Sequence, residues 1–472
     1  MATTPRRHVT AIVLAAGAGS RFGGGKLLAS VDGKPILQHV LDSLAAAAVQ
    51  DVIVVLGDDA REIERRIHWR TERRVRNPDP GRGLSSSVRV GLEAVDPSTD
   101  GALFVLGDQP SVRPEVMTTV ATADVSAGAS IVVPRYAEGG GPNPVLVLRA
   151  AFGLATELEG DRGFGPLIGA HRERVQEVPV GGSNPDVDTR GDLALLAERM
   201  WADRVRANRE QVDRFREVGD GDFYAGTTSL FIADPRRSDT DDVSLAALRA
   251  LASRDETWLD IGAGAGRYAL PLALVAREVI AIDPSPAMLA GLREGMATHG
   301  IANIRVIEGR WPLAAADLAL PAADVALIAH VGYDVEAIGP FLDAMERSAR
   351  RLCVALLMRQ TPASVAEPFW PPIHGEARIP LPALAAFVDL LRARGRMPEV
   401  HEVEREERHF HDRESTIGFL RRQTWVAVGG AKDRRLEALV DERLVENEDG
   451  SVSLRDVPDL RLGVVTWRPG SG

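Results

Sequence analysis

A glycine-rich loop near the start of the chain carries two basic residues, Arg21 and Lys26, in positions that suit polyphosphate binding. The apolar residues 11–15 before the loop predict a buried strand, and the pattern after it predicts an amphipathic helix. Loops of small residues let backbone N–H groups approach an anion closely. Arg21 and Lys26 would then add charge-assisted hydrogen bonds to a triphosphate. The spacing matches neither a P-loop, which needs Ser or Thr directly after Gly-Lys, nor the dinucleotide fingerprint.

A carboxylate follows a second apolar run. The strand expected over residues 102–106 brings Asp108 to its carboxyl end, between a Gly and a Gln-Pro pair. Mg²⁺ takes one or two protein carboxylates and fills its other positions with phosphate oxygens and water. A lone Asp at a strand end is usually a helix cap, but the flanking residues favour a metal ligand here.

Composition limits the class of protein. A chain of 472 residues is too long for one ordinary core, so two or three domains are expected. The net charge of −11 argues against nucleic-acid binding, which needs a basic surface. The single cysteine, Cys353, excludes a disulfide framework and a cysteine-rich metal site. Residues 1–8 are not expected to form a signal peptide, and no apolar run has the length of a membrane span. We therefore expect a cytoplasmic enzyme of small molecules, with neither nucleic-acid nor membrane partners.

Strand and helix patterns alternate through the first 200 residues, which predicts a doubly wound α/β sheet. Ligands of such sheets bind outside the carboxyl ends of the strands. The polar segment 77–87 lies after one such strand and opens a helix, with residues 85–87 as capping candidates.

The first motif, Leu14-Ala15-Ala16-Gly17 with Gly19, Arg21 and Lys26, is similar to the L-A-A-G-x-G-x-R-x-G-x-x-K signature of nucleotidyltransferases. Within these it resembles the MobA-like NTP transferases, and among them the molybdenum cofactor cytidylyltransferases. The resemblance implies that these residues bind the nucleotide, that Ser85 and Ser86 lie over its base, and that Arg21, Lys26, Asp108 and Asp186 are catalytic. It also implies that Asp186 completes with Asp108 a Mg²⁺ site. The alternative is an ordinary glycine-rich turn.

The same resemblance bears on the substrates. Cytidylyl-transferring members carry Leu-Ala-Ala-Gly where guanylyl-transferring members carry Leu-Ala-Gly-Gly, so residues 14–17 favour CTP. The loops at 139–144 and 160–165 resemble acceptor-binding loops, although the second ends in Phe164-Gly165 where relatives usually have Ala-Arg. The resemblance implies molybdopterin as the acceptor and molybdoenzyme maturation factors as candidate partners. A sugar phosphate or phospholactate acceptor and a non-catalytic, regulatory nucleotide-binding domain remain alternatives.

A second expected strand followed by a glycine-rich loop lies in the other half of the chain. Asp260 precedes a loop containing Gly262, Gly264 and Gly266, and Asp283 ends the next expected strand about twenty residues on, where a ribose-binding carboxylate belongs. NAD binding is one interpretation. With residues 283–289, however, the pattern resembles class I S-adenosylmethionine methyltransferases. The resemblance implies that the cofactor is bound by Asp260, Gly262, Gly264, Gly266, Asp283 and Glu308. His330 is a conceivable base, although a packing role is more common.

Together these patterns predict a bifunctional enzyme with two Rossmann-like α/β domains, a nucleotidyltransferase fold followed by a class I methyltransferase fold. We expect the first domain at 1–200, a helical connector at 201–240 and the second domain at 241–472. The expected cofactors are Mg²⁺ and S-adenosylmethionine, with CTP as the nucleotide substrate. No motif names the methyl acceptor.

Overall fold

A computed structural model describes residues 7–17, 19–47, 49–155, 157–219, 234–236, 242–313, 322–403, 409–458 and 461–470. The chain divides into two compact units, Met1–Leu196 and Ala197–Gly472, each described here by itself. The boundary falls within helix α7, Arg190–Phe215. Part of the predicted connector lies outside the described residues. Among the described helices, none combines the length and the apolar character that a membrane crossing requires.

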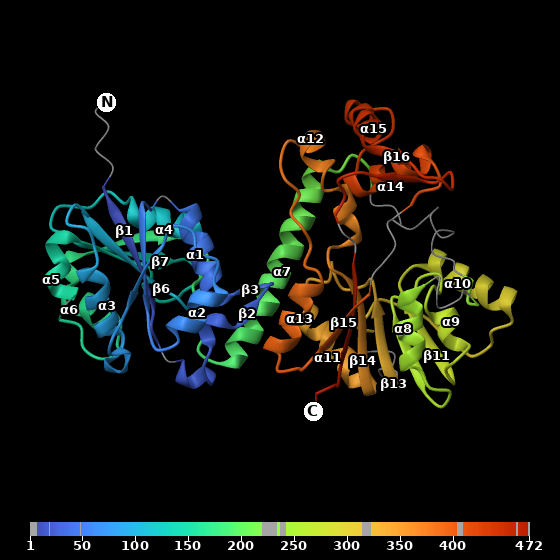
Figure 1. Ribbon diagram of the computed structural model, residues 1–472, viewed down its shortest axis with the longest axis horizontal. Coiled ribbons are helices and arrows are strands. Elements are labelled where there is room, and N and C mark those ends of the chain that lie inside the picture. Colours follow the sequence, from blue (N-terminus) through green and yellow to red (C-terminus); the bar gives the residue numbers. More distant parts are fainter. Residues whose placement is uncertain are drawn as a thin grey trace. The chain divides into compact units, whose positions relative to one another are not determined.

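The first unit is built on one mixed sheet of seven strands (Figure 1). In spatial order these are β5 (Arg73–Arg76), β4 (Asp51–Leu56), β1 (Val9–Ala15), β6 (Gly101–Leu106), β8 (Val145–Leu148), β7 (Ile131–Tyr136) and β9 (Val175–Val180). The strands β5, β4, β1 and β6 are mutually parallel, whereas β8 runs antiparallel to both of its neighbours. The carboxyl ends of β1 and β6 therefore meet at one edge of the sheet.

Alternate residues of β1 face opposite sides of this sheet, because successive side chains of a strand point to opposite faces. Ala11 and Val13 pack in one apolar cluster with α1 and α4, and Ile12 and Leu14 pack in another with α3, α5 and α6. The helices of the unit are α1 (Ile36–Ala46), α2 (Ala60–Arg66), α3 (Leu84–Glu93), α4 (Pro114–Ala121), α5 (Phe152–Ala155) and α6 (Gly165–Ala170). A two-stranded ribbon is formed by β2 (Ser30–Val31) and β3 (Lys34–Pro35). Helices on both faces confirm the predicted doubly wound architecture.

The second unit has its own sheet of seven strands. In spatial order these are β12 (Ile304–Glu308), β11 (Glu278–Asp283), β10 (Thr257–Ile261), β13 (Ala323–Ala329), β14 (Ala349–Met358), β18 (Leu462–Trp467) and β15 (Glu399–Val403). The first five are parallel, and β18 runs antiparallel to both β14 and β15. The strands β14 and β15 are thus parallel to each other and end at the edge where β10 and β13 end.

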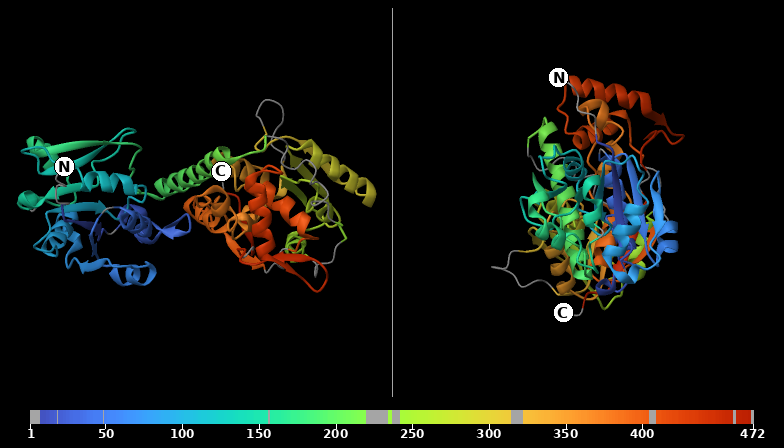
Figure 2. Two further views of the ribbon diagram at one scale, coloured as in Figure 1. Left: turned by 90° about the horizontal axis from the view of Figure 1, so that it is seen from above. Right: turned by 90° about the vertical axis from the view of Figure 1, so that its left-hand side faces the viewer.

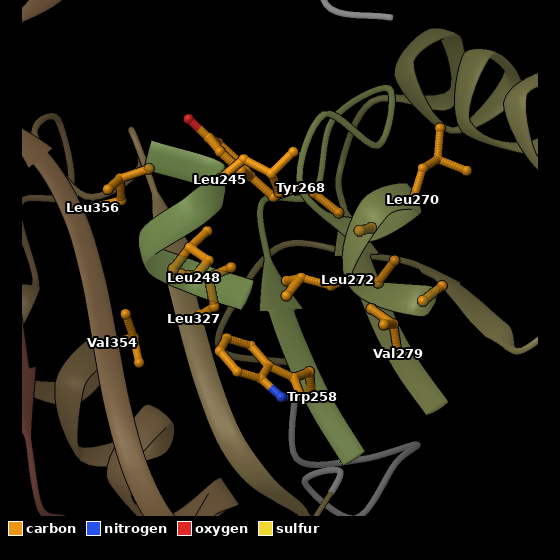
Figure 3. Packing of buried hydrophobic residues seen from close by; sticks show 14 of the residues in the cluster. Leu245, Leu248, Trp258, Tyr268, Leu270, Leu272, Val279, Leu327, Val354 and Leu356 are labelled. Atoms are coloured by element: carbon orange, nitrogen blue, oxygen red, sulfur yellow. The ribbon is translucent and has the colours of Figure 1, made fainter. Parts of the chain in front are cut away.

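Helices cover both faces of this second sheet and confirm the predicted α/β class. They are α8 (Val243–Leu251), α9 (Ala269–Ala273), α10 (Pro286–His299), α11 (Ile338–Ser348) and α13 (Leu384–Ala393). Figure 3 shows Leu245 and Leu248 of α8 and Leu272 of α9 over one face of the sheet. On that face they meet Trp258 and Leu327, from the neighbouring strands β10 and β13.

Additional elements of the second unit form a separate apolar cluster, which we call the cap module. It comprises a 3₁₀ turn at Pro362–Ala366, α12 (Trp370–His374), α14 (Arg413–Thr424), α15 (Ala431–Arg443), β16 (Leu444–Glu446) and β17 (Val452–Leu454). Its orange and red segments lie together in Figures 1 and 2. The first part follows β14, and the second part lies between β15 and β18. Both therefore leave the sheet at the edge where β10 ends.

Candidate functional site

The glycine loop of the first unit leaves the carboxyl end of β1 and runs to Lys26. Leu14 and Ala15 are buried residues of the strand, so they support the loop, which begins after Ala16. Backbone φ is positive at Gly19, Gly23, Gly24 and Gly25. A Cβ atom at Gly17, Gly23, Gly24 or Gly25 would meet no atom of the described residues within 4 Å. The loop thus presents backbone to open space, as a phosphate-binding loop requires.

Lys26 joins two carboxylates at the centre of this site. Its Nζ atom donates to Asp108 Oδ2 at 2.6 Å and to Asp188 Oδ1 at 3.0 Å, and its side chain is only 9% exposed. Arg21 lies further out, with its guanidinium 3.4 Å from Asp188 Oδ2 and an exposed side chain. The sequence analysis identified Lys26, Arg21 and Asp108, and the structure brings all three together.

The charges of these side chains shift one another's pKa values. Burial alone would lower the pKa of Lys26, but the charges and hydrogen bonds of Asp108 and Asp188 outweigh burial and raise it. Burial raises the pKa of Asp108, against the opposing charge of Lys26, and the nearby charge of Asp186 raises it further. Lys26 therefore remains an ammonium ion at neutral pH.

Asp188 is a site residue that the sequence analysis did not select. The nearby helix cap is Thr189, whose Oγ1 accepts from the backbone N–H of Asp192 at 3.1 Å. The Asp192 carboxylate in turn accepts from the backbone N–H groups of Asp188 and Thr189. Asp188 is thus left to face Lys26. The predicted ligand Asp186 lies two residues earlier, so the Asp-x-Asp pattern held the signal but did not say which carboxylate faces the lysine.

Asp186 is instead held by a relay of buried amides. Gln109 Nε2 donates to Asp186 Oδ1, and Asn184 Nδ2 donates to Gln109 Oε1 at 2.9 Å and to the carbonyl of Asn143 at 3.3 Å. Gln109 and Asn184 are almost fully buried. Tyr136 also donates to the Asn143 carbonyl, at 2.8 Å. The relay connects the segment that carries Asp186 with the loop that resembles an acceptor-binding loop.

The predicted serines lie in helix α3. The helix begins at Leu84 with Gly83 as its N-cap, so residues 85–87 are buried inside it and are not its caps. Asn77 Nδ2 donates to the hydroxyl of Ser86 at 2.8 Å and to that of Ser87 at 3.0 Å. Ser85 N–H donates to the carbonyl of Gly160 at 3.1 Å. The segment at 77–87 therefore contacts the other loop that resembles an acceptor-binding loop, the one at 160–165.

The glycine loop of the second unit follows β10 in the same way. Gly262, Gly264 and Gly266 all have positive φ. A Cβ atom on Gly262 would lie 2.5 Å from Val331 Cγ2, so a side chain there is excluded by the segment after β13. At Gly264 the nearest atom of the described residues would be Met288 Sδ, at 4.0 Å, so this part of the loop faces open space.

The three predicted cofactor-binding carboxylates differ in environment. Asp283 ends β11, and its two oxygens accept from the N–H groups of Gly264 at 2.9 Å and Ser285 at 2.8 Å. Asp260 is 2% exposed, and burial, followed by the charge of Asp283, raises its pKa to about 7. Glu308 is exposed at the end of β12, in register with Asp283. The loop and Asp283 are thus joined by a hydrogen bond at the carboxyl edge of the sheet.

His330 lies directly after β13, beside the glycine loop. Its φ is 59°, an uncommon value for a residue with a side chain, and its backbone N–H donates to Leu356 O at 2.9 Å. Its Nε2 lies 3.2 Å from the hydroxyl of Tyr268. The next residue, Val331, is the one that packs on Gly262.

The first site fits a divalent cation and the second fits an adenosyl cofactor, as the sequence implies. Two carboxylates that converge on one ammonium, from separate segments of the first unit, form the donor set of a hard divalent cation. Among the described residues no group of three or more His, Cys, Asp or Glu side chains is placed to hold a metal, so phosphate and water would complete the shell. In the second unit, the open backbone at Gly264 and the carboxylate of Asp283 suit an adenosyl cofactor.

Two families match this chain. Residues 11–175 match the MobA-like NTP transferase domain, and residues 259–352 match a methyltransferase domain. The bifunctional protein GlmU of Sorangium cellulosum is 32% identical over 162 residues, 32% of this chain and 34% of that protein. The chain thus spans about a third of the length of this relative.

Two further relatives are similar to parts of this chain. The CMP-5'-(3-aminopropyl)phosphonate synthase of Streptomyces rubellomurinus is 33% identical over 246 residues, 48% of this chain and 35% of that protein. A probable molybdenum cofactor guanylyltransferase of Thermococcus gammatolerans is 29% identical over 128 residues, 27% of this chain and 62% of that protein. The chain therefore joins a MobA-like NTP transferase domain to a methyltransferase domain, as the motifs of its two halves predict.

Proposed function

We propose that the first unit transfers the cytidylyl group of CTP to a phosphorylated small molecule, with molybdopterin as the first candidate acceptor. The observation that carries this proposal is the convergence of Lys26, Asp108 and Asp188 beside an open glycine loop. Nucleotidyl transfer depends on positioning and charge neutralisation more than on covalent help from the protein. This arrangement supplies both.

The reaction exchanges one phosphorus–oxygen bond for another. An oxygen of the acceptor phosphate forms a bond to the α-phosphorus of CTP, and the bond to the β-phosphate breaks, so pyrophosphate leaves with the electron pair. Backbone N–H groups of the glycine loop and Arg21 hold the triphosphate, and Lys26 stabilises charge on its oxygens. A bound Mg²⁺ would neutralise the leaving pyrophosphate. No general base is required, because an acceptor phosphate is already ionised.

The relatives supply two acceptors to compare. The molybdenum cofactor guanylyltransferase supports a molybdopterin acceptor, and the Leu-Ala-Ala-Gly sequence at residues 14–17 favours cytidylyl over guanylyl transfer. The phosphonate synthase is named for a product that contains CMP. This supports CTP as the nucleotide substrate and favours a phosphonate as the second candidate acceptor. A phosphonate oxygen attacks an α-phosphorus by the same displacement.

We further propose that the second unit binds S-adenosylmethionine on its glycine loop and transfers the methyl group to a small molecule. Gly264 and Asp283 are the residues expected to contact the cofactor, with Asp260 beneath them. Methyl transfer from a sulfonium is an in-line displacement that depends chiefly on proximity and alignment. His330 lies where it could orient an acceptor.

Pyrophosphate release by the full-length protein tests the first proposal. CTP, GTP, ATP and UTP are each supplied with Mg²⁺ and either molybdopterin or 3-aminopropylphosphonate. We expect release with CTP only, reduced about a hundredfold in Asp108→Asn. Asp186→Asn and Asp188→Asn form a matched pair. Asp188→Asn should reduce release as strongly as Asp108→Asn, because it removes the second carboxylate that faces Lys26, and Asp186→Asn should reduce it far less.

The unfolding transition of the first unit, measured by scanning calorimetry on each variant, reports whether that unit is folded. Absence of release with every nucleotide and both acceptors, in wild-type protein that keeps this transition, would refute the nucleotidyl-transfer proposal. Selective release with GTP would refute its cytidylyl part.

A further inference from the structure

Lys26 occupies an unusual position for a residue expected to bind phosphate. Its ammonium contacts one carboxylate from the end of β6 and another from the segment before α7, at 2.6 and 3.0 Å. Its side chain is 9% exposed, whereas those of Asp108 and Asp188 are 29% and 46% exposed, so the ion pairs are partly shielded from solvent. Such pairs are screened less by salt than surface pairs. The ammonium thus lies between the two carboxylates that would bind a divalent cation.

The chemistry of this residue stands out against the rest of the chain. Of 56 basic residues only three are lysines, and these are Lys26, Lys34 and Lys432. An ammonium is a compact charge on a flexible stem, whereas a guanidinium is broad and planar. Lys34 and Lys432 form partly exposed pairs with Asp42 and Glu217. A compact cation that can be exchanged for a metal ion suits position 26 better than the arginine used almost everywhere else.

The glycine loop packs directly on this side chain. A Cβ atom on Gly19 would lie 3.1 Å from Lys26 Cβ, and Gly19 has a φ of 57°. The side chain that carries the ammonium therefore starts directly beside the loop that is expected to hold the triphosphate. A triphosphate on that loop would lie within reach of the ammonium.

We propose that in the nucleotide-free protein Lys26 stands in for the divalent cation between Asp108 and Asp188, and that the metal enters only when the nucleotide's phosphates draw the ammonium away. This inference rests on the proposed function. Removing the ammonium alone would leave two partly exposed carboxylates close together without a counter-ion, which is unfavourable because like charges repel. A triphosphate offers Lys26 new charge-assisted hydrogen bonds as the metal takes its former place. Metal and nucleotide are then expected to bind together and not one after the other.

Mn²⁺ binding to the full-length protein, followed by the electron paramagnetic resonance signal of the free ion, tests this inference. We expect wild-type protein to bind Mn²⁺ weakly alone and at least about tenfold more tightly with a non-hydrolysable CTP analogue. In Lys26→Met the affinity for Mn²⁺ without nucleotide should rise about tenfold, because the competing charge is gone. Lys34→Met is the matched control, and its Mn²⁺ affinity should equal that of the wild type.

Unchanged Mn²⁺ affinity in a folded Lys26→Met protein would overturn the inference. Failure of the proposed function has a different signature, since wild-type protein would then release no pyrophosphate from CTP with either acceptor, whatever Lys26→Met does to the Mn²⁺ affinity. Wild-type protein provides a second measurement if Lys26→Met does not fold. Reductive ¹³C-methylation labels three lysines and the N-terminus, and the signal lost in Lys26→Arg identifies Lys26. We expect that signal to shift when the CTP analogue and Mg²⁺ are added together but not when Mg²⁺ is added alone, and a signal that stays unmoved with both would also overturn the inference.

Discussion

Asp260 is a buried residue of β10, the strand that leads into the second glycine loop. Its Oδ2 atom is buried and has no hydrogen-bond partner among the residues that the structure describes. Burial and the neighbouring charge of Asp283 raise its pKa from 3.8 to about 7. The folded state therefore holds a proton that the unfolded state has released over the interval between these two values.

This difference predicts how stability depends on pH. Because the folded protein binds more protons between about pH 4 and pH 7, its stability should fall as pH rises through that range. In Asp260→Asn this contribution is absent. Between pH 5 and pH 8, without cofactor, the melting temperature of the second unit should fall about 5 °C more in wild type than in Asp260→Asn. Scanning calorimetry measures both.

The exposed Asp255 gives a matched control, since Asp255→Asn should follow the wild-type profile. The comparison concerns the slope with pH, because the new amide changes stability by a constant amount at every pH. Equal slopes in Asp260→Asn and wild type would contradict the assignment.

At the scale of single residues, sequence predicted the groups that follow strands. Lys26, Asp108 and Asp260 occupy positions that a strand and its following loop determine. Asp188 and Gln109 were not identified as site residues, because their roles depend on which of several neighbouring polar side chains turns inward. Neither periodicity nor spacing records that choice, which is made by contacts between residues about eighty or more positions apart.

The glycine loop after β10 shows how one element restricts another. Gly262 has a φ of 78°, and its Cβ position is 2.5 Å from Val331 Cγ2, whereas the Cβ position of Gly264 meets only Met288 Sδ, at 4.0 Å. Gly264→Ala should therefore cost only the left-handed strain, about 1 kcal/mol. Gly262→Ala should destabilise the ligand-free unit by about 3 kcal/mol, because strain and overpacking add. Urea denaturation without ligand measures the two losses.

A second substitution separates the two causes. Val331→Ala removes the methyl groups that the new Cβ would meet, so Gly262→Ala/Val331→Ala should recover stability relative to the sum of the single losses. Equal losses in Gly262→Ala and Gly264→Ala, or strict additivity in the double variant, would show that packing against Val331 is unimportant.

At the scale of elements, apolar runs predicted the central strands well. The strands β1, β4, β6, β10 and β11 lie where such runs end before glycine or aspartate. The beginning of α3 was misjudged because Gly83, and not a serine, caps it. No sequence pattern paired the segment after β14 with α14 and α15. The two parts meet through apolar contacts between segments far apart in the chain.

The whole molecule contains separate apolar clusters. Those of the first unit use residues before position 197, and those of the second use residues after it. We therefore expect each ligand to stabilise its own unit by mass action. In scanning calorimetry, CTP with Mg²⁺ should raise one transition by several degrees, and S-adenosylhomocysteine should raise the other. A shift of both transitions by either ligand alone would show that the units unfold as one.

The positions of the two ends of the segment that carries α14 and α15 have a consequence for how this chain can evolve. Val403 and Leu462 lie opposite each other in the β15–β18 pairing. Everything between them leaves and re-enters the sheet at neighbouring points, so its length is not constrained by strand spacing. Lineages can lengthen, exchange or reshape this segment without disturbing Gly264 or Asp283. Evolutionary divergence in methyl-acceptor choice should therefore concentrate there, while the cofactor-binding edge stays the same.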